Sequence, residues 1–324
     1  MKMDVGIIGT GVMGKNHVRV YSELKSVGDV MVYDINTAAA SDVAKKTGAM
    51  ATDSMESLFR QVDAVSICVP TQYHFETALK AAEAGVHMLI EKPVCLTSAE
   101  AIALCERIPD DLVVGVGHIE RFNPIVEEIR RIVKDPLYVE IKRHNPASAR
   151  ITGSSVVEDL MIHDIDILFN NCCFRGPYRL TCSGNHDVCG ALFDFEKFPV
   201  YLSASRKASK KIRMVYIEED EFTIEGDFMA QEIYVHRKPD TYSHESDRYV
   251  QENVVEKVMV AKVEPLKMEL STFVQCAKAG KGFPITPTQA IRNIQICEEI
   301  RQKCAKRSKV HKAVQQGIET ASSL

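Results

Sequence analysis

The stretch GIIGTGVMG at residues 6–14 constrains the fold of this chain more than any other segment. It follows a short apolar run and spaces Gly9, Gly11 and Gly14 as G-x-G-x-x-G. In a strand–turn–helix unit, the first glycine allows a tight turn, the second lets a diphosphate approach the backbone, and the third lets the helix pack close to the strand. The diphosphate then lies at the positive N-terminal end of the helix. The segment therefore predicts a dinucleotide-binding βαβ unit at the start of the chain.

An acidic residue follows at the distance that such a unit requires. Asp34 lies 20 residues after Gly14, directly behind a second apolar run. A carboxylate at this place accepts hydrogen bonds from the ribose hydroxyls and repels a 2′-phosphate, so it favours NAD over NADP. The alternative is a plain turn in which the acid caps a helix. We expect the cofactor loop to comprise Gly9, Thr10, Gly11, Val12, Met13 and Gly14.

Strand-like and helical segments alternate through the first 118 residues. The short apolar segments are 5–8, 30–33, 64–69, 88–90 and 113–116, and the helical segments are 12–24, 37–46, 73–84 and 98–108. Thr97 and Glu100 form a capping box in front of the last helix. This alternation predicts an α/β Rossmann domain over residues 1–118, with a doubly wound parallel sheet and helices on both faces.

The pattern changes after residue 118. Helical segments are expected at 123–133, 156–170, 265–279 and 288–305, and strands at 137–143, 191–195, 200–204, 213–217, 221–225 and 232–236. The run of strands predicts a large, mainly antiparallel sheet with one packed face and one face that is open or covered by a partner. Residues 119–324 are therefore expected to form an α+β domain for substrate binding and oligomerisation.

Composition excludes several classes of protein. The chain has 324 residues, of which 45% are hydrophobic and 26% charged, as expected for two globular domains. A net charge of −4 gives no basic excess for a nucleic-acid partner. The apolar runs are too short to span a membrane, and the first residues enter a strand pattern without a signal peptide, so we expect a cytoplasmic protein. The 10 cysteines contain no C-x-x-C pair, which favours reduced thiols and no metal site.

Four motifs resemble one enzyme family. They are GIIGTGVMG, CVPTQYH at 68–74, EKP at 91–93 and D-x-x-x-H-x-x-D at 159–166, and PLKMELSTFVQC at 265–276 extends the match. Together they resemble the Gfo/Idh/MocA family of sugar and cyclitol dehydrogenases. The resemblance implies a Rossmann domain, a second domain with a large open sheet, and a site between them. It also implies a homodimer or homotetramer formed through that sheet, with the helix at 288–305 packing back near the Rossmann domain.

Two further motifs narrow the resemblance. GHIERFNP at 117–124 and DLMIHDIDIL at 159–168 are similar to UDP-N-acetylglucosamine 3-dehydrogenases, which oxidise the sugar 3-hydroxyl to a ketone. Met161 stands where many members of the broad family carry glycine, so a substrate such as inositol is less safe to assume. Two alternatives stay open: another sugar or inositol dehydrogenase of the family, and a non-catalytic NAD(H)-binding regulatory protein. The second has no need for Lys92, Asp159 and His163 together.

Oxidation of a secondary alcohol needs a hydride acceptor, here NAD, and a base for the hydroxyl proton. Lys92 precedes a proline at the carboxyl edge of the sheet, where doubly wound folds bind ligands. His163 changes its charge nearest neutral pH. Our primary hypothesis makes His163 the base, while Lys92 holds the same oxygen; the swapped roles remain open. Asp159 would position the substrate or orient His163.

The remaining site expectations rest on position in the chain. Pro70, Thr71, His74 and Glu91 are expected near the cofactor, although His74 could instead be a helix N-terminal residue without a ligand. Arg121 and Asn123 lie just after the last expected strand of the Rossmann domain, where either could contact cofactor or substrate; a domain-hinge ion pair is the alternative. Arg143 and Arg150 are candidates for contact with the diphosphate of a nucleotide sugar, because guanidinium groups suit phosphate geometry.

The segment 156–170 carries its polar residues in one stripe if it is an α-helix. Asp159, His163, Asp166 and Asn170 are spaced i, i+4, i+7 and i+11. Ser155 and Glu158 form a capping box at its start. We expect the stripe to face the substrate, with Asp166 supporting the helix from behind and Asp164 in a structural role. The alternative is a buried stripe whose members satisfy one another.

Overall fold

The computed structural model describes residues 2–150, 153–171, 176–238, 242–245, 248–251 and 254–321. They divide into two compact units. The first unit comprises Met1–Phe122 and Val263–Gln295, and the second comprises Asn123–Lys262 and Ile296–Leu324. This division differs from the continuous second domain expected from residue 119 onward. Residues 263–295 belong to the first unit because apolar side chains of this segment, such as Leu270 and Phe273, are buried in its core.

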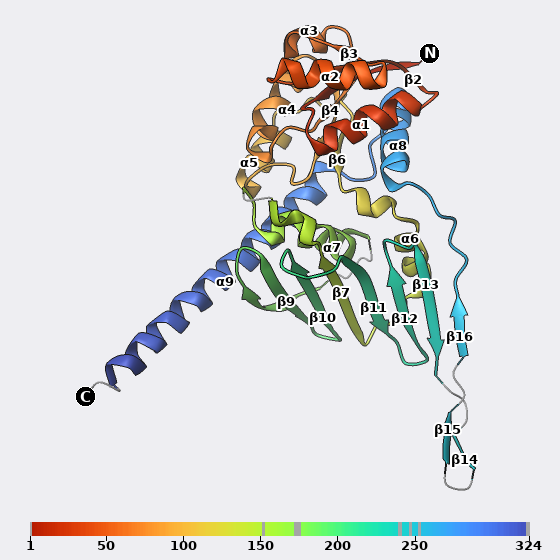
Figure 1. Cartoon of the computed structure of the whole chain (residues 1–324), viewed down its shortest axis with the longest axis vertical. Coiled ribbons are helices and arrows are strands. Elements are labelled where there is room, and N and C mark those ends of the chain that lie inside the picture. Colours follow the sequence, from red (N-terminus) through yellow and green to blue (C-terminus); the bar gives the residue numbers. More distant parts are fainter. Residues whose placement is uncertain are drawn as a thin grey trace. The chain divides into compact units, whose positions relative to one another are not determined.

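The first unit is built on a six-stranded sheet in the order β3-β2-β1-β4-β5-β6 (Figure 1). Its strands, all parallel, are β1 (Met3–Ile8), β2 (Val27–Tyr33), β3 (Met50–Ala51), β4 (Ala64–Ile67), β5 (His87–Glu91) and β6 (Val114–Gly117). The helices are α1 (Val12–Glu23), α2 (Thr37–Thr47), α3 (Met55–Phe59), α4 (His74–Glu83), α5 (Ser98–Cys105) and α8 (Pro265–Ala279), with the single turns η1 (Thr71–Tyr73) and η2 (Ile119–Phe122). The doubly wound parallel sheet is confirmed, and β3 and α3 are additions that the sequence did not indicate.

The strand order reverses between β1 and β4, and this arrangement gathers three loops. β1 pairs with β2 on one side and with β4 on the other. The Gly9 N–H donates to the Tyr33 carbonyl at 2.8 Å, and the Cys68 N–H donates to the Ile8 carbonyl at 2.8 Å. The carboxyl ends of β1, β2 and β4 therefore meet at the switch point, where open α/β sheets bind ligands.

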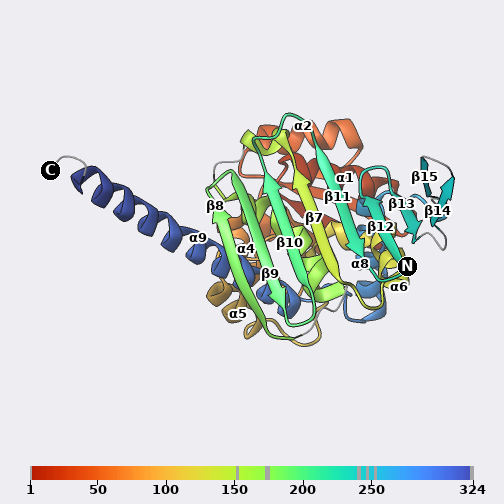
Figure 2. The same cartoon turned by 90° about the horizontal axis from the view of Figure 1, so that it is seen from below.

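The second unit contains an eight-stranded sheet in the order β16-β13-β12-β11-β7-β10-β9-β8, seen face-on in Figure 2. The strands are β7 (Tyr138–His144), β8 (Tyr178–Gly184), β9 (Val188–Phe195), β10 (Pro199–Ser205), β11 (Ile212–Glu218), β12 (Phe222–Asp227), β13 (Glu232–Arg237) and β16 (Val254–Lys257). β7 and β10 run parallel and the other neighbours run antiparallel, so the mainly antiparallel sheet is confirmed. A separate pair joins β14 (Tyr242–Glu245) to β15 (Arg248–Gln251).

Helices cover one face of this sheet. They are α6 (Pro124–Ile132) and a helical run made of η4 (Val157–Met161), α7 (Ile162–Asp166) and η5 (Ile167–Asn171). Burial alternates along the strands, as in β7, which is typical of a sheet with one packed face. Within the second unit, none of the described helices covers the face turned to the viewer in Figure 2. The helix α9 (Pro287–Ala321) starts in the first unit, ends in the second, and is longer than the expected 288–305.

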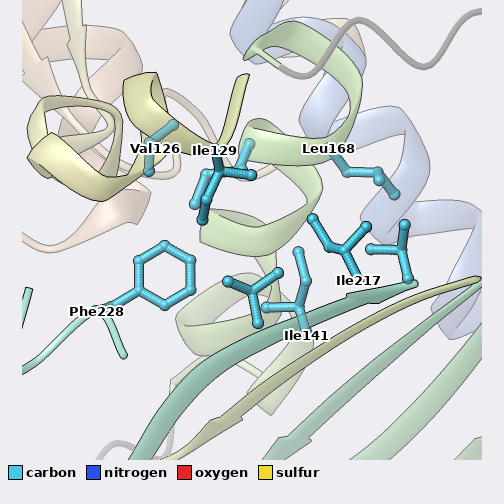
Figure 3. A pocket seen from close by; sticks show the side chains of 9 residues that line it. Val126, Ile129, Ile141, Leu168, Ile217 and Phe228 are labelled. Carbon is cyan, nitrogen blue, oxygen red and sulfur yellow. The ribbon is translucent and has the colours of Figure 1, made fainter. Parts of the chain in front are cut away.

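A small cavity lies in the core of the second unit between α6, η5 and the sheet (Figure 3). Its volume is ≈ 10 Å³, about the space of one water molecule. Its lining is entirely apolar and consists of Val126, Ile129, Val139, Ile141, Ile167, Leu168, Val215, Ile217 and Phe228. An apolar space of this size stays dry, so it is a packing gap and not a ligand site. No helix among the described residues is long and apolar enough to cross a membrane.

Candidate cofactor and catalytic sites

The glycine loop after β1 has the shape that its spacing predicts. Gly9 has a φ of +95°, and a Cβ there would lie 2.8 Å from the carbonyl oxygen of Cys68. A Cβ on Gly14 would lie 1.8 Å from the Gly9 carbonyl oxygen, so only glycine allows α1 to start this close to the turn. A Cβ on Gly11 would meet nothing within 4 Å. The loop is thus closed beneath Gly9 and Gly14 and open at Gly11, where a diphosphate would approach the backbone.

Asp34 stands beside this loop at the end of β2. One carboxylate oxygen accepts hydrogen bonds from the backbone N–H of Thr10 at 2.6 Å and from its hydroxyl at 2.8 Å. The other accepts from the Asn36 N–H at 2.8 Å. Burial opposes ionisation, but these hydrogen bonds outweigh it and hold the pKa of Asp34 below its usual value. An ionised carboxylate has about four acceptor positions, so capacity remains for a ribose hydroxyl of NAD.

Sequence reasoning missed one residue at this edge. Ile35 directly follows Asp34 and is 92% exposed, which is unusual for a large apolar side chain. The flat apolar face of an adenine base is the part of a dinucleotide that such a side chain could cover. The signal in the sequence was the apolar residue in the tripeptide Asp34-Ile35-Asn36, where a turn would favour polar side chains.

The expected residues after β4 divide into two groups. Pro70 is exposed and Thr71 is half-buried, so both can contact a cofactor. His74 is 1% exposed, and its ring nitrogens Nδ1 and Nε2 lie 2.8 Å from the carbonyl oxygens of Pro93 and Val69. Burial lowers the pKa of His74, while the contacts with the Val69 and Pro93 carbonyls act in the opposite direction. His74 thus joins the loops after β4 and β5, and its expected place beside the cofactor stays a prediction.

Lys92 lies where β5 ends, half-buried, and a cis peptide bond joins it to Pro93. The neighbouring Glu91 is buried and points into the first unit. Its Oε2 accepts a hydrogen bond from the Lys92 N–H at 3.2 Å, and its Oε1 lies 3.0 Å from Nε2 of His17. Glu91 was expected to contact the cofactor, and this stays a prediction; in the structure its buried carboxylate contacts His17 and the Lys92 N–H.

In the second unit, the segment 156–170 is helical but not a regular α-helix. Its two ends, η4 and η5, are π-helical, so the strict i, i+4 spacing of the predicted polar stripe does not hold. His163 remains half-exposed, whereas Asp159 is largely buried. Arg206, which sequence reasoning did not identify, lies 3.3 Å from Oδ2 of Asp159 and donates to the Ser154 carbonyl at 2.8 Å. A buried cation therefore holds the Asp159 carboxylate.

The neighbouring acids of this run are structural, as expected. The guanidinium of Arg143 donates to Oδ1 of Asp164 from Nε at 2.8 Å and from Nη2 at 2.6 Å, and both side chains are 1% exposed. Asp166 is buried and accepts from Asn170 at 3.1 Å. Of the two hydrogen bonds of the expected capping box, one is present: the Ser155 N–H donates to Glu158 at 3.1 Å, while the Ser155 hydroxyl accepts from the Val157 N–H.

Three of the expected substrate contacts are engaged elsewhere. Arg143 is buried against Asp164, so its expected role as a diphosphate ligand does not hold and we do not retain it. Asn123 caps α6 and donates to the Phe228 carbonyl at 2.9 Å, a structural role. Arg121 donates to Oε1 of Gln289 at 2.9 Å, which ties η2 to the start of α9. The side chain of Arg150 lies outside the described part of the structure.

Comparison with known proteins finds a family that the first unit resembles. The model of the GFO_IDH_MocA family, an oxidoreductase family with an NAD-binding Rossmann fold, matches residues 3–123. UDP-N-acetylglucosamine 3-dehydrogenase from Acidithiobacillus ferrooxidans is 39% identical over 167 residues, which are 51% of this chain and 53% of that enzyme. Inositol 2-dehydrogenase from Paracoccus denitrificans is 29% identical over 180 residues, 52% of this chain and 54% of that enzyme. The chain thus spans about half the length of these curated relatives.

A solved structure extends the likeness to both units. The structure of UDP-N-acetylglucosamine 3-dehydrogenase from Acidithiobacillus ferrooxidans aligns with a TM-score of 0.81 at 28% identity. The alignment covers 94% of this chain and 98% of that chain. The open glycine loop and the ionised Asp34 agree with the NAD-binding family model. The first unit is therefore similar to the NAD-binding Rossmann domain of the Gfo/Idh/MocA oxidoreductase family.

Proposed function

We propose that the protein is an NAD-dependent dehydrogenase that oxidises the 3-hydroxyl of a UDP-N-acetylglucosamine-type nucleotide sugar to the 3-keto sugar. The observation that carries the proposal is the position of Lys92 at the carboxyl end of β5, in the same sheet as the NAD loop, where its backbone N–H donates to Glu91. Similarity to UDP-N-acetylglucosamine 3-dehydrogenase in sequence and in structure supports the choice of substrate.

The roles of the side chains follow from the needs of alcohol oxidation. Bound NAD supplies the hydride acceptor. His163 accepts the hydroxyl proton on its imidazole, and the ammonium of Lys92 holds the same oxygen and stabilises its developing negative charge. The swapped assignment is the alternative. Asp159, whose orientation is restrained by Arg206, positions the substrate or orients His163.

A direct test is NADH formation with NAD and a panel of UDP-sugars, free sugars and inositols. We expect turnover with UDP-N-acetylglucosamine and a loss of about 100-fold or more in kcat for Lys92→Ala and His163→Ala. Lys46→Ala is the matched control, because this lysine is 71% exposed and pairs only with Asp42 on its own helix among the ion pairs of the described residues. Near-native rates in both variants would contradict the assignment.

The same panel separates the alternatives. Turnover of a free inositol or sugar, with none of the UDP-sugar, would support another dehydrogenase of the family, in line with the similarity to inositol 2-dehydrogenase. Tight NADH binding without turnover of any alcohol would support a regulatory protein.

The half-exposed sheet face of the second unit fits a homo-oligomer. Its outward strand positions carry apolar and aromatic side chains such as Leu192, Tyr201 and Tyr216. We expect this face to bind a second copy in a homodimer or homotetramer. Light scattering of the purified protein checks this, and a monomer at micromolar concentration would contradict it.

A further inference from the structure

A buried histidine on α1 has no part in the roles assigned above. His17 is 0% exposed, although histidine is seldom fully buried without a partner of matching chemistry. Its partner is Glu91, on the strand that ends at Lys92. We propose that His17 is a positioning residue for Lys92, acting through the Glu91 carboxylate that holds the Lys92 backbone.

The contacts form a chain of two hydrogen bonds. Nε2 of His17 lies 3.0 Å from Oε1 of Glu91, and Oε2 of Glu91 accepts the Lys92 N–H at 3.2 Å. One carboxylate thus connects α1, the helix of the cofactor loop, to the end of β5. Because a rotation of the carboxylate would move both oxygens together, the bond to His17 determines where the acceptor for Lys92 lies.

The protonation states follow from the burial of Glu91. Burial opposes its ionisation, but the hydrogen bond and Coulombic interaction with His17, together with the interactions with Lys92, hold the pKa of Glu91 below its usual value. An ionised carboxylate only accepts hydrogen bonds, so Nε2 of His17 must carry the proton. His17 therefore acts as the donor that keeps a buried anion satisfied.

Besides His17 and the Lys92 N–H, the Glu91 carboxylate packs against a glycine. A Cβ on Gly117 in β6 would lie 2.9 Å from Oε1 and 3.2 Å from Oε2 of Glu91. The carboxylate therefore fills the space that the absent side chain leaves, and has little room to turn while His17 is present. Without His17, a buried anion loses a donor and must neutralise or reorient, and either change removes the fixed acceptor of the Lys92 N–H.

A neighbouring residue on the same helix provides a matched control. Tyr21 is also fully buried, packs edge-to-face on His17 with 6.2 Å between the ring centroids, and hydrogen-bonds through its hydroxyl to Ser66 at 2.9 Å. Its hydroxyl contacts Ser66 and not Glu91. Tyr21→Phe therefore removes a buried hydrogen bond from the same core without touching the chain from His17 to Lys92.

The first experiment is site-resolved hydrogen exchange at the Lys92 amide. We expect His17→Ala to accelerate exchange there by about tenfold or more relative to core amides of β4, while Tyr21→Phe changes this ratio by less than about threefold. His17→Gln should restore protection, because its side-chain amide can replace the Nε2–H donor. If His17→Ala does not fold, His17→Asn, which is too short to reach Glu91, takes its place. Unchanged exchange at Lys92, or an equal change in Tyr21→Phe, would overturn the proposal.

The second experiment is kinetic and rests on the proposed function. We expect His17→Ala to lower kcat by about tenfold or more, with little change in the KM for NAD, and His17→Gln to recover most of the rate. If the wild-type protein turns over no alcohol, the proposed function fails, while the exchange measurement still decides the role of His17. An increase in the KM for NAD without a decrease in kcat would show that His17 only supports the cofactor loop. A decrease in kcat that His17→Gln does not reverse would show that His17 only supports the core.

Discussion

Replacing Arg143 by methionine tests whether this arginine stabilises the second unit or contacts the substrate. Its guanidinium and the carboxylate of Asp164 are both 1% exposed and are joined by hydrogen bonds of 2.8 and 2.6 Å. Methionine keeps the apolar stem but leaves the carboxylate without the guanidinium. Breaking a buried ion pair from one side costs about 3–5 kcal/mol, because an uncompensated charge stays behind.

This decrease in the free energy of unfolding should be measurable by thermal unfolding. For a unit of this size each kcal/mol lowers Tm by about 2–4 °C, so we expect a decrease of about 6–20 °C in the transition of the second unit. The double variant Arg143→Met/Asp164→Leu should recover most of it, because apolar replacement of a whole buried pair is close to neutral. Differential scanning calorimetry of the single and double variants measures this coupling.

A surface pair provides the control. Arg179 also donates to an aspartate, Asp194, at 2.7 Å, but it is 89% exposed. Arg179→Met should cost less than about 1 kcal/mol, because exposed pairs are weak. The structural role would be refuted if Arg143→Met had the same Tm as the wild type and a KM for a nucleotide sugar that is tenfold or more higher. That result would favour the original hypothesis that Arg143 contacts the substrate.

Three other predictions concern the first unit. Asp34→Ala should lower kcat/KM for NAD by about 10–100-fold and reduce the preference over NADP, because charged hydrogen bonds to the ribose are lost; the ratio of the two cofactors in steady-state assays checks this. Gly14→Ala should abolish tight NADH binding, measured by fluorescence titration, since its Cβ would lie 1.8 Å from the Gly9 carbonyl oxygen. The pKa of Glu91 is lower in the folded protein than in the unfolded chain. The ionised carboxylate therefore stabilises the fold above about pH 4.3, and this stabilisation is lost as the pH falls through the pKa of the folded state. The Tm of Glu91→Gln should therefore fall less steeply between about pH 5 and pH 3 than that of the wild type.

Local patterns were enough to predict most of the elements that carry the site. The spacing of Gly9, Gly11 and Gly14 predicts the open loop. The steric reason is local at Gly14, where a Cβ would meet the Gly9 carbonyl oxygen, whereas a Cβ on Gly9 would meet the backbone of Cys68, which follows the neighbouring strand β4. Thr97 caps its helix as its half of the capping box predicts, with the Glu100 N–H donating to Thr97 at 3.1 Å, while the Glu100 carboxylate accepts from the Leu96 N–H. The elements missed, β3 and α3 among them, span 2 and 5 residues, too few for a period to emerge.

The sequence by itself determined the alternation of strand and helix, the dinucleotide loop and the acid that favours NAD, since these depend on neighbours along the chain. Only the tertiary structure decided which polar residues are working groups and which are structural. His17 and Glu91 are 74 residues apart and Arg143 and Asp164 are 21 apart, yet each pair forms a buried contact. An isolated motif cannot distinguish an arginine that binds phosphate from one that neutralises a buried acid, because both need the same guanidinium. The physical difference is burial and the identity of the partner, which arise when distant segments pack together.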